Sequence, residues 1–228
     1  MKKLETVKLN TVSSTSTYAR ENISSLSLPS LITADYQTNG RGRQGKSFYS
    51  PADSGLYMTL AFEVQKPLPL ITPAAAVAVC ETLRYFGLSP VIKWANDVFV
   101  DDKKICGILI ENTFSGAFVQ SSVVGVGLNV NGFFEGELKE IATSMQAQTG
   151  KTFSVEKVTE RLIDELLKER EMQEYLAYIG YMGREVTLIL GEEKARGKLL
   201  SVDGEGGLLA EINGETRRLT SAEVSIRL

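Results

Sequence analysis

The glycine-rich run at residues 40–45, Gly-Arg-Gly-Arg-Gln-Gly, restricts the possible folds of this 228-residue chain more than any other feature. Its spacing matches the GxGxxG pattern of Rossmann nucleotide sites, which need a helix that begins within the glycines. The next residues, Lys46–Pro51, include a proline and are poor helix formers. We therefore expect a flexible loop instead, with the guanidinium groups of Arg41 and Arg43 facing an anion. A solvated surface turn is the alternative for the run on its own.

Apolar spacing along the first 180 residues predicts helices and strands in mixed order, which is typical of an α+β fold with a mixed β-sheet flanked by helices. One helix is expected after the capping residues 13–17, a second opens at Thr72-Pro73 and ends near Phe86, and a long third one begins at Ser154. The apolar positions of the long helix are Val155, Val158, Leu162, Leu166, Leu176 and Ile179. Strands are expected at Thr6–Val12, Leu31–Ala34, Leu56–Val64, Val91–Trp94, Val98–Val100, Lys104–Glu111 and Ala117–Val126.

After Gly183 the sequence changes to short strands separated by turns. The pair Asn213-Gly214 is a strong signal for a two-residue hairpin. These features predict a small β-barrel or sandwich, and hence two domains at residues 1–182 and 183–228. The expected strands are Val186–Leu190, Ala195–Val202, Gly207–Ile212, Glu215–Leu219 and Val224–Leu228.

Composition excludes several kinds of chemistry. The chain has no histidine, so Ser-His-Asp and Cys-His catalysis and His-based zinc sites are ruled out. Two cysteines make no disulfide framework, and we expect Cys106 to be a buried core thiol rather than a nucleophile. A net charge of -3 argues against broad attachment to DNA. No stretch resembles a membrane span or a signal peptide, so a cytoplasmic location is expected.

Two segments combine lysine with other polar groups beside apolar strands. In Lys93-Trp94-Ala95-Asn96-Asp97, the carboxylate of Asp97 is suited to bind Mg²⁺ or accept a proton, and Lys93 is suited to neutralise phosphate. The alternative is a polar turn with the indole packed in the core. In residues 103–111, Lys104 leads directly into an apolar strand, and burial of an unpaired ammonium is costly. We expect it to face an anionic ligand; a turn lysine in water is the alternative.

A third segment, Gly125–Asn131, ends an apolar strand with glycines and asparagines. Asn129 offers both a donor and an acceptor to the edge of a base. A β-bulge and turn without a ligand is equally compatible with these residues.

In this order, the GRGRxG, KWxND, KxxGILxE and GxGxN motifs resemble the catalytic module of bacterial biotin protein ligases. The resemblance implies a sheet domain like that of class II aminoacyl-tRNA synthetases, followed by a small SH3-like β-barrel. It implies that biotin is activated with Mg-ATP and transferred to a lysine of a biotin carboxyl carrier protein, by an enzyme that is a monomer or a homodimer. Ala95 replaces the proline usual in the family, and we expect a local change of geometry rather than loss of activity.

The resemblance also implies roles for individual residues. Lys104, Arg41, Lys93 and Asp97 are expected in catalysis, with Asp97 as metal ligand or base. The expected biotin contacts are Ser14, Thr15, Ser16, Gln37, Arg41, Gly42, Arg43, Lys104 and Gly107. The expected ATP contacts are Arg43, Lys93, Asn96 and Asn129.

The ligase motifs begin near residue 13 without a winged-helix segment before them, so a DNA-binding role is not expected. Two alternatives remain open. One is a lipoate or octanoate ligase or transferase of related fold; a transferase would use Cys106 to carry the acyl group. The other is a sensor that binds biotin without turnover.

Overall fold

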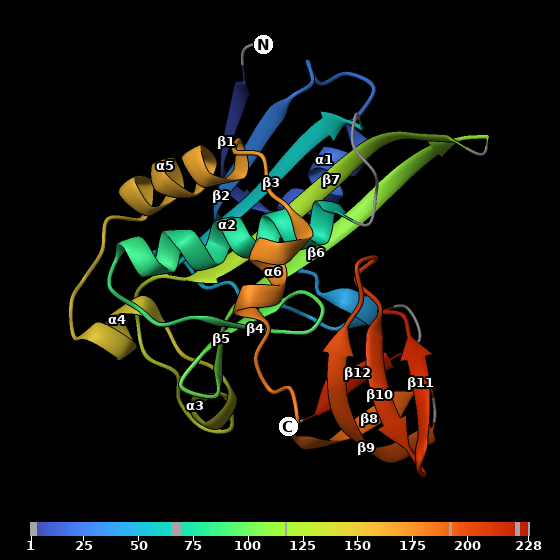
Figure 1. Cartoon of the computed structure of the whole chain (residues 1–228). Helices are drawn as coiled ribbons and strands as arrows, with labels where there is room; N and C mark the ends of the chain where they lie inside the picture. The colour runs from blue at the N-terminus through green and yellow to red at the C-terminus, as the bar shows by residue number, and fades with distance from the viewer. Residues whose placement is uncertain (1–3, 65–69, 117, 192, 222–223, 228) are drawn as a thin grey trace.

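A seven-stranded mixed sheet is the larger of the two sheets in the computed structural model, which describes residues 4–64, 70–116, 118–191, 193–221 and 224–227 (Figure 1). The strand order is β1-β2-β3-β7-β6-β5-β4. The pair β1 and β2 is parallel and all other neighbours are antiparallel, which confirms the expected mixed sheet. The strands are β1 (Glu5–Val12), β2 (Ser30–Gln37), β3 (Gly55–Glu63), β4 (Val91–Lys93), β5 (Asp97–Val100), β6 (Lys103–Ser115) and β7 (Phe118–Asn129).

The strand predictions locate every strand of this sheet, but β6 and β7 are longer than expected. The two strands pair with each other almost throughout their length and form a long hairpin that extends beyond the other strands (Figure 1). The predicted start of β7, Ala117, lies outside the described residues. Asp101 and Asp102 adopt positive φ angles of 49° and 59° in the turn between β5 and β6.

Helices cover both faces of the sheet. Neighbouring residues of a strand point to opposite faces, and Leu31 and Ile32 of β2 belong to different core clusters. Ile32 packs with Ala19 of α1, whereas Leu31 belongs to the larger cluster under α2. The helices are α1 (Thr15–Glu21), α2 (Ile71–Tyr85), α3 (Leu138–Ile141), α4 (Met145–Thr149), α5 (Val155–Leu166) and α6 (Met172–Tyr178), with a 3₁₀ turn η1 at Arg43–Gly45.

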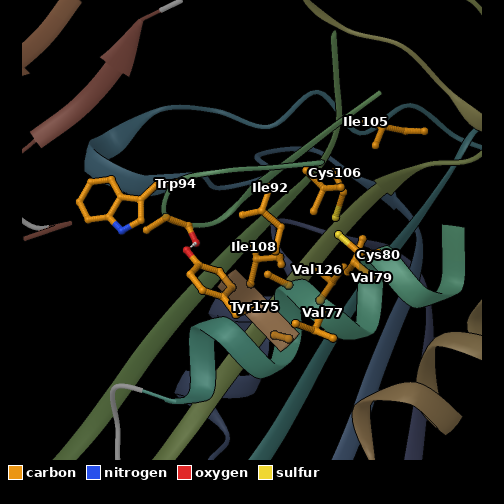
Figure 2. Packing of buried hydrophobic residues seen from close by; sticks show 14 of the residues in the cluster. Val77, Val79, Cys80, Ile92, Trp94, Ile105, Cys106, Ile108, Val126 and Tyr175 are labelled. Atoms are coloured by element: carbon orange, nitrogen blue, oxygen red, sulfur yellow. Dashed lines mark hydrogen bonds between the residues drawn. The ribbon is translucent and has the colours of Figure 1, made fainter. Parts of the chain in front are cut away.

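The core under α2 is closely packed and apolar (Figure 2). Val77, Val79 and Cys80 of α2 meet Cys106 and Ile108 of β6, all with no more than 2% of their surface exposed. Both cysteines are free thiols. Burial raises the pKa of Cys106 far above its ordinary value. The prediction that Cys106 is a core thiol is confirmed.

The prediction of one long helix from Ser154 to Ile179 is wrong. Ser154 does cap a helix, since its hydroxyl accepts the Lys157 N–H at 3.3 Å, but α5 ends at Leu166 and α6 begins at Met172. Glu171 and Glu174 form a reciprocal capping box at the start of α6, which satisfies N–H groups that a continuous helix would have bonded internally. The apolar spacing continues through the break because both helices pack on the same α2.

The last strands form a separate antiparallel sheet in the order β11-β10-β9-β8-β12. The hairpin between β10 and β11 turns at Asn213 and Gly214, with φ angles of 52° and 80°, and the prediction of a two-residue turn is confirmed. Leu228, the predicted end of the last strand, lies outside the described residues. The strands are β8 (Glu185–Leu190), β9 (Glu193–Val202), β10 (Leu208–Ile212), β11 (Glu215–Leu219) and β12 (Val224–Arg227).

The apolar residues of the small sheet are continuous with the larger core. Leu188, Leu199 and Leu208 are fully buried and belong to the same cluster as Ile92 and Trp94. The small sheet therefore packs directly against the β4 end of the larger sheet. Within the described part of the chain, the helices are too short or too polar to cross a membrane.

Candidate active site

A cavity of about 200 Å³ lies where the N-terminus of α1, the glycine-rich loop, and strands β6 and β7 meet. Most of its lining is polar, and widely separated parts of the sequence contribute to it, within residues 14–16, 37, 41–48, 58, 93–97, 104–109, 125–127 and 226. The residues expected at the site that line this cavity are Ser14, Thr15, Ser16, Gln37, Arg41, Gly42, Arg43, Lys93, Asn96, Asp97, Lys104 and Gly107. Asn129 is the one expected residue absent from this lining.

Buried hydroxyl groups form one wall of the cavity. Ser14 caps α1 and places Thr15 and Ser16 at the first turn of the helix, all three at most 5% exposed. The Thr15 N–H and hydroxyl both donate to the Gln37 side-chain oxygen, at 2.9 and 3.2 Å. Gln37 in turn donates through Nε2 to the Ser50 hydroxyl at 2.9 Å. The wall is therefore a prearranged polar surface whose groups hold one another in place.

Glycines leave parts of the sheet surface beneath the cavity without side chains. Gly107 and Gly127 are register partners on β6 and β7, and a Cβ added to Gly127 would lie 2.5 Å from the Phe48 ring. A Cβ at Gly125 would lie 2.3 Å from the Ser16 hydroxyl oxygen. Larger residues at these positions would displace the aromatic ring or the hydroxyl wall.

The glycine-rich run forms a narrow hairpin. No α-helix begins within residues 40–45, all of which the structure describes, and this agrees with the expectation that the run is not a Rossmann turn. Arg41 and Ser47 pair across it, and the Gly42 N–H donates to the Lys46 carbonyl at 2.7 Å. A Cβ on Gly40 would lie 2.4 Å from the Phe48 carbonyl oxygen, so only glycine fits there. Gln44 adopts a left-handed conformation at the tip of the hairpin.

The two arginines of the hairpin have different partners. Arg41 Nη1 donates to the Glu111 carboxylate at 3.0 Å. Arg43 Nη1 donates to the Asn96 side-chain oxygen at 2.6 Å, and its Nη2 donates to the backbone carbonyl of Ser221. Burial lowers the pKa of Arg43, although the negative charge of Asp97 acts in the opposite direction. Arg43 thus connects the loop to both the β4–β5 turn and the small sheet.

Asp97 and Lys104 form an ion pair in the cavity wall, with Nζ and Oδ1 2.8 Å apart. Both side chains are about one-third exposed, so the pair is open to the cavity. Lys93 Nζ lies 4.9 Å from the centre of the Phe99 ring, also at the cavity. The expectation that Lys104 faces the pocket rather than bulk water is met by its position.

Trp94 is packed in the core, as the alternative interpretation of its motif expects. Its ring is 5% exposed and belongs to the core, and its indole N–H donates to the Gly206 carbonyl at 2.9 Å. The next peptide bond, Trp94–Ala95, is cis, and the Ala95 carbonyl accepts the Tyr175 hydroxyl at 2.9 Å. Figure 2 shows Tyr175 below this turn, with its hydroxyl directed at it.

Asn129 is buried at the end of β7, where its Nδ2 donates to the Thr143 carbonyl at 2.9 Å. The Asn129 side chain therefore holds the segment after β7 in place and does not line the cavity.

Three further residues belong to the site or support it, although none of them was singled out from the sequence: Phe48, Glu111 and Ile226. Phe48 follows the glycine run closely enough to have been suspected. Ile226 gave no such signal, because only the folding of β12 brings it there.

Among the described residues, no group of three or more Cys, Asp and Glu side chains is arranged to hold a metal ion. Asp97 is the one carboxylate in the described cavity lining. Mg²⁺ usually binds to one or two protein carboxylates together with substrate phosphates and water. The residues present therefore fit a magnesium ion delivered with a nucleotide.

The fold and the mostly polar cavity belong to a class of ligases that the comparisons with known proteins identify. The biotin/lipoate A/B protein ligase family matches residues 9–129, and the biotin protein ligase C-terminal domain matches residues 181–227. The chain belongs to this family, among the biotin protein ligases.

Individual relatives agree with this assignment. The bifunctional ligase/repressor BirA of Bacillus subtilis is 33% identical over 215 residues, covering 86% of this chain and 66% of the relative. The biotin–[acetyl-CoA-carboxylase] ligase of Paracoccus denitrificans is 27% identical, covering 85% of this chain and 88% of the relative. The structure of the Aquifex aeolicus biotin protein ligase in complex with biotin and ATP has 30% identity, covers 98% of each chain and has a TM-score of 0.82.

Proposed function

We propose that this chain activates biotin with ATP to biotinyl-5′-AMP and transfers the biotinyl group to a lysine of a biotin carboxyl carrier protein. The observation that carries the proposal is the convergence of Lys104, both loop arginines and the α1 hydroxyl wall on the same cavity. The Aquifex relative, similar over 98% of this chain, was solved with biotin and ATP. The location is the cytoplasm, where carrier and ATP are available.

In the first step the biotin carboxylate attacks the α-phosphorus of ATP, forming a mixed anhydride and releasing pyrophosphate. The buried hydroxyls of Ser14, Thr15 and Ser16, with Gln37, suit the ureido ring of biotin, which has both donors and acceptors. Lys104 then lies where the carboxylate and the phosphate meet. Its positive charge offsets the repulsion between the two anions, which otherwise opposes the attack.

Arg43, Lys93 and Asn96 line the same cavity on the β4–β5 side and are the proposed nucleotide contacts. Asp97 is the proposed protein ligand of Mg²⁺, and the ion supplies charge neutralisation for the phosphates when bound. Asn129 acts on the nucleotide side through the segment it orders, since its amide is bonded to Thr143.

In the second step the amine of the carrier lysine attacks the anhydride carbonyl and AMP leaves. This step needs a neutral amine, and Asp97, as the alternative to its role as metal ligand, is the carboxylate in the cavity suited to accept the proton. Positioning and charge neutralisation carry both steps, which explains how a chain without histidine works.

We also propose that residues 1–182 and 183–228 are two domains. The two separate sheets and the family match that begins at residue 181 support this division. The first domain holds most of the cavity, and the second contributes Ile226 and the Ser221 carbonyl.

The structure weakens the acyl-transferase alternative, because the Cys106 thiol is fully buried under α2 and its raised pKa disfavours the thiolate.

The decisive test of the proposed function is intact-mass measurement after incubation of the full chain with biotin, Mg-ATP and a biotin carrier domain. One added biotinyl group per carrier is expected, with none when octanoate or lipoate replaces biotin. A chain that binds biotin but produces neither AMP nor labelled carrier would instead be a sensor.

A further inference from the structure

Glu111 is the last residue of the lysine-containing strand motif, and none of the roles given above includes it. Its side chain is 19% exposed and lies on β6 opposite Val123 of β7. One carboxylate oxygen accepts Arg41 Nη1 at 3.0 Å and the other accepts Arg20 Nη1 at 3.2 Å. Arg20 belongs to α1, so one side chain connects three separate parts of the chain.

These three parts are the ones that must be aligned around biotin. Helix α1 carries the hydroxyl wall at its N-terminus and is held to the sheet through Ala19, which packs with Val123. The glycine-rich hairpin carries Arg41, which lines the cavity. Strand β6 carries Lys104.

The charges explain why a carboxylate is needed at this position. Two guanidinium groups that approach one site repel each other, and a carboxylate between them turns the repulsion into two attractions. Glu111 uses one of the five N–H donors of Arg41 and leaves the rest of that side chain for the cavity. Without it, Arg41 loses its fixed direction, and the hairpin keeps the two bonds of Arg43 at its tip but loses this attachment to β6.

We propose that Glu111 is a positioning residue of the biotin-activating site, which orients Arg41 and holds the glycine-rich hairpin against β6 before the ligand binds. The proposed role of Glu111 rests on the proposed function only where it is tested by enzyme kinetics. The contact between Glu111 and Arg41 can be tested without it.

The test compares the full chain with its Glu111→Gln variant, which preserves shape and removes the charge. Trypsin reports on the hairpin directly, because Arg41, Arg43 and Lys46 are potential cleavage sites within it. In the absence of ligand, cleavage in residues 40–47 is expected to accelerate about tenfold, as for the loss of a partly exposed charge-assisted bond. In biotin-dependent ATP–pyrophosphate exchange, KM for biotin is expected to rise about tenfold with a smaller change in kcat.

Three further variants make the result specific. Glu21→Gln removes the same charge from an exposed position on α1 and is expected to match the wild type in both assays. Arg20→Gln leaves the bond to Arg41 in place and is expected to keep the hairpin protected. If Glu111 acts through Arg41, Glu111→Gln has no further effect on exchange in an Arg41→Gln background.

Equal cleavage rates and equal KM values in Glu111→Gln and wild type would overturn the proposal, as would full additivity with Arg41→Gln. If Glu111→Gln does not fold, Glu111→Asp keeps the charge but shortens the reach, and the same two readouts apply. Absence of biotin-dependent exchange in the wild type would count against the proposed function, and the cleavage result would still decide the role of Glu111.

Discussion

Lys104 is the residue on which the proposed chemistry depends most directly. Its ammonium lies 2.8 Å from Asp97 and faces the cavity, whereas the neighbouring Lys103 points elsewhere and donates to the Lys139 carbonyl at 2.7 Å. The two adjacent lysines therefore have opposite orientations, as expected for successive residues of a strand. In the proposed reaction, Lys104 is therefore the one of the two that meets the carboxylate of biotin.

Lys104→Ala is expected to reduce biotin-dependent ATP–pyrophosphate exchange at least about 100-fold, which is typical for loss of one group that stabilises charge in a transition state. Lys103→Ala removes an equal charge from the next position and is expected to stay within about twofold of the wild type. Both rates are measured with the purified full chain at saturating biotin and ATP. An undiminished rate in Lys104→Ala would remove this lysine from the chemistry.

At the scale of elements, the sequence predicted the strands of both sheets because period-two alternation and turn residues act locally. It also singled out twelve of the cavity-lining residues through their resemblance to a known family, but not Phe48, Met58 or Ile226. Contacts between distant segments were beyond such reasoning. The bond of Glu111 to Arg41 crosses 70 positions. The short helices α3 and α4 also escaped, because four or five residues are too few to show a helical period.

The break between α5 and α6 shows how local charge overrides apolar spacing. Glu165, near the end of α5, is 1% exposed and receives hydrogen bonds from Arg161, Lys168 and Arg170. Burial raises the pKa of Glu165, but the hydrogen bond from Lys168 and the three positive charges outweigh this and hold the pKa below its usual value. Lys168 and Arg170 lie in the segment between the helices, so the cluster holds the chain where it leaves α5.

Glu165→Gln is expected to lower the free energy of unfolding at pH 7 by about 2 kcal/mol, less than the 3–5 typical of a fully buried pair because Arg161 and Lys168 are partly exposed. Because the folded-state pKa is depressed, the contribution of the carboxylate is complete above its ordinary pKa of 4.5 and is lost as the pH falls through the lower folded value. Urea unfolding at several pH values measures both effects.

Glu160→Gln, an exposed position on the same helix, is the matched control and is expected to change stability by less than about 0.5 kcal/mol. A difference between wild type and Glu165→Gln that stays constant down to pH 3 would contradict the assigned role of the charge.

For the molecule as a whole, the active site depends on how the small sheet meets the larger one. The two share one apolar core, and Ile226 of β12 lines the cavity. Polar bonds from Trp94 to Gly206 and from Arg43 to Ser221 cross the same boundary. Both donors come from motifs of the active site, so movement of the small sheet would disturb the nucleotide side first.

Trp94→Phe removes the indole donor and leaves the Gly206 carbonyl without it. We expect hydrogen exchange of β8–β12 amides to accelerate about tenfold, since loss of a buried hydrogen bond costs about 1–2 kcal/mol. The exchange assay is expected to show a raised KM for ATP, because Arg43 loses its fixed position between Asn96 and Ser221. Tyr175→Phe is the matched control, because it removes a bond to the neighbouring Ala95 carbonyl and leaves the contact with the small sheet intact.

In Tyr175→Phe the amides of both sheets are expected to exchange faster to a similar degree, as in a general loss of stability. In Trp94→Phe the increase is expected to be confined to the small sheet. The same pattern in both variants would mean that the indole bond does not hold the two sheets together, and the apolar core shared by Ile92 and Leu199 would then be the main attachment.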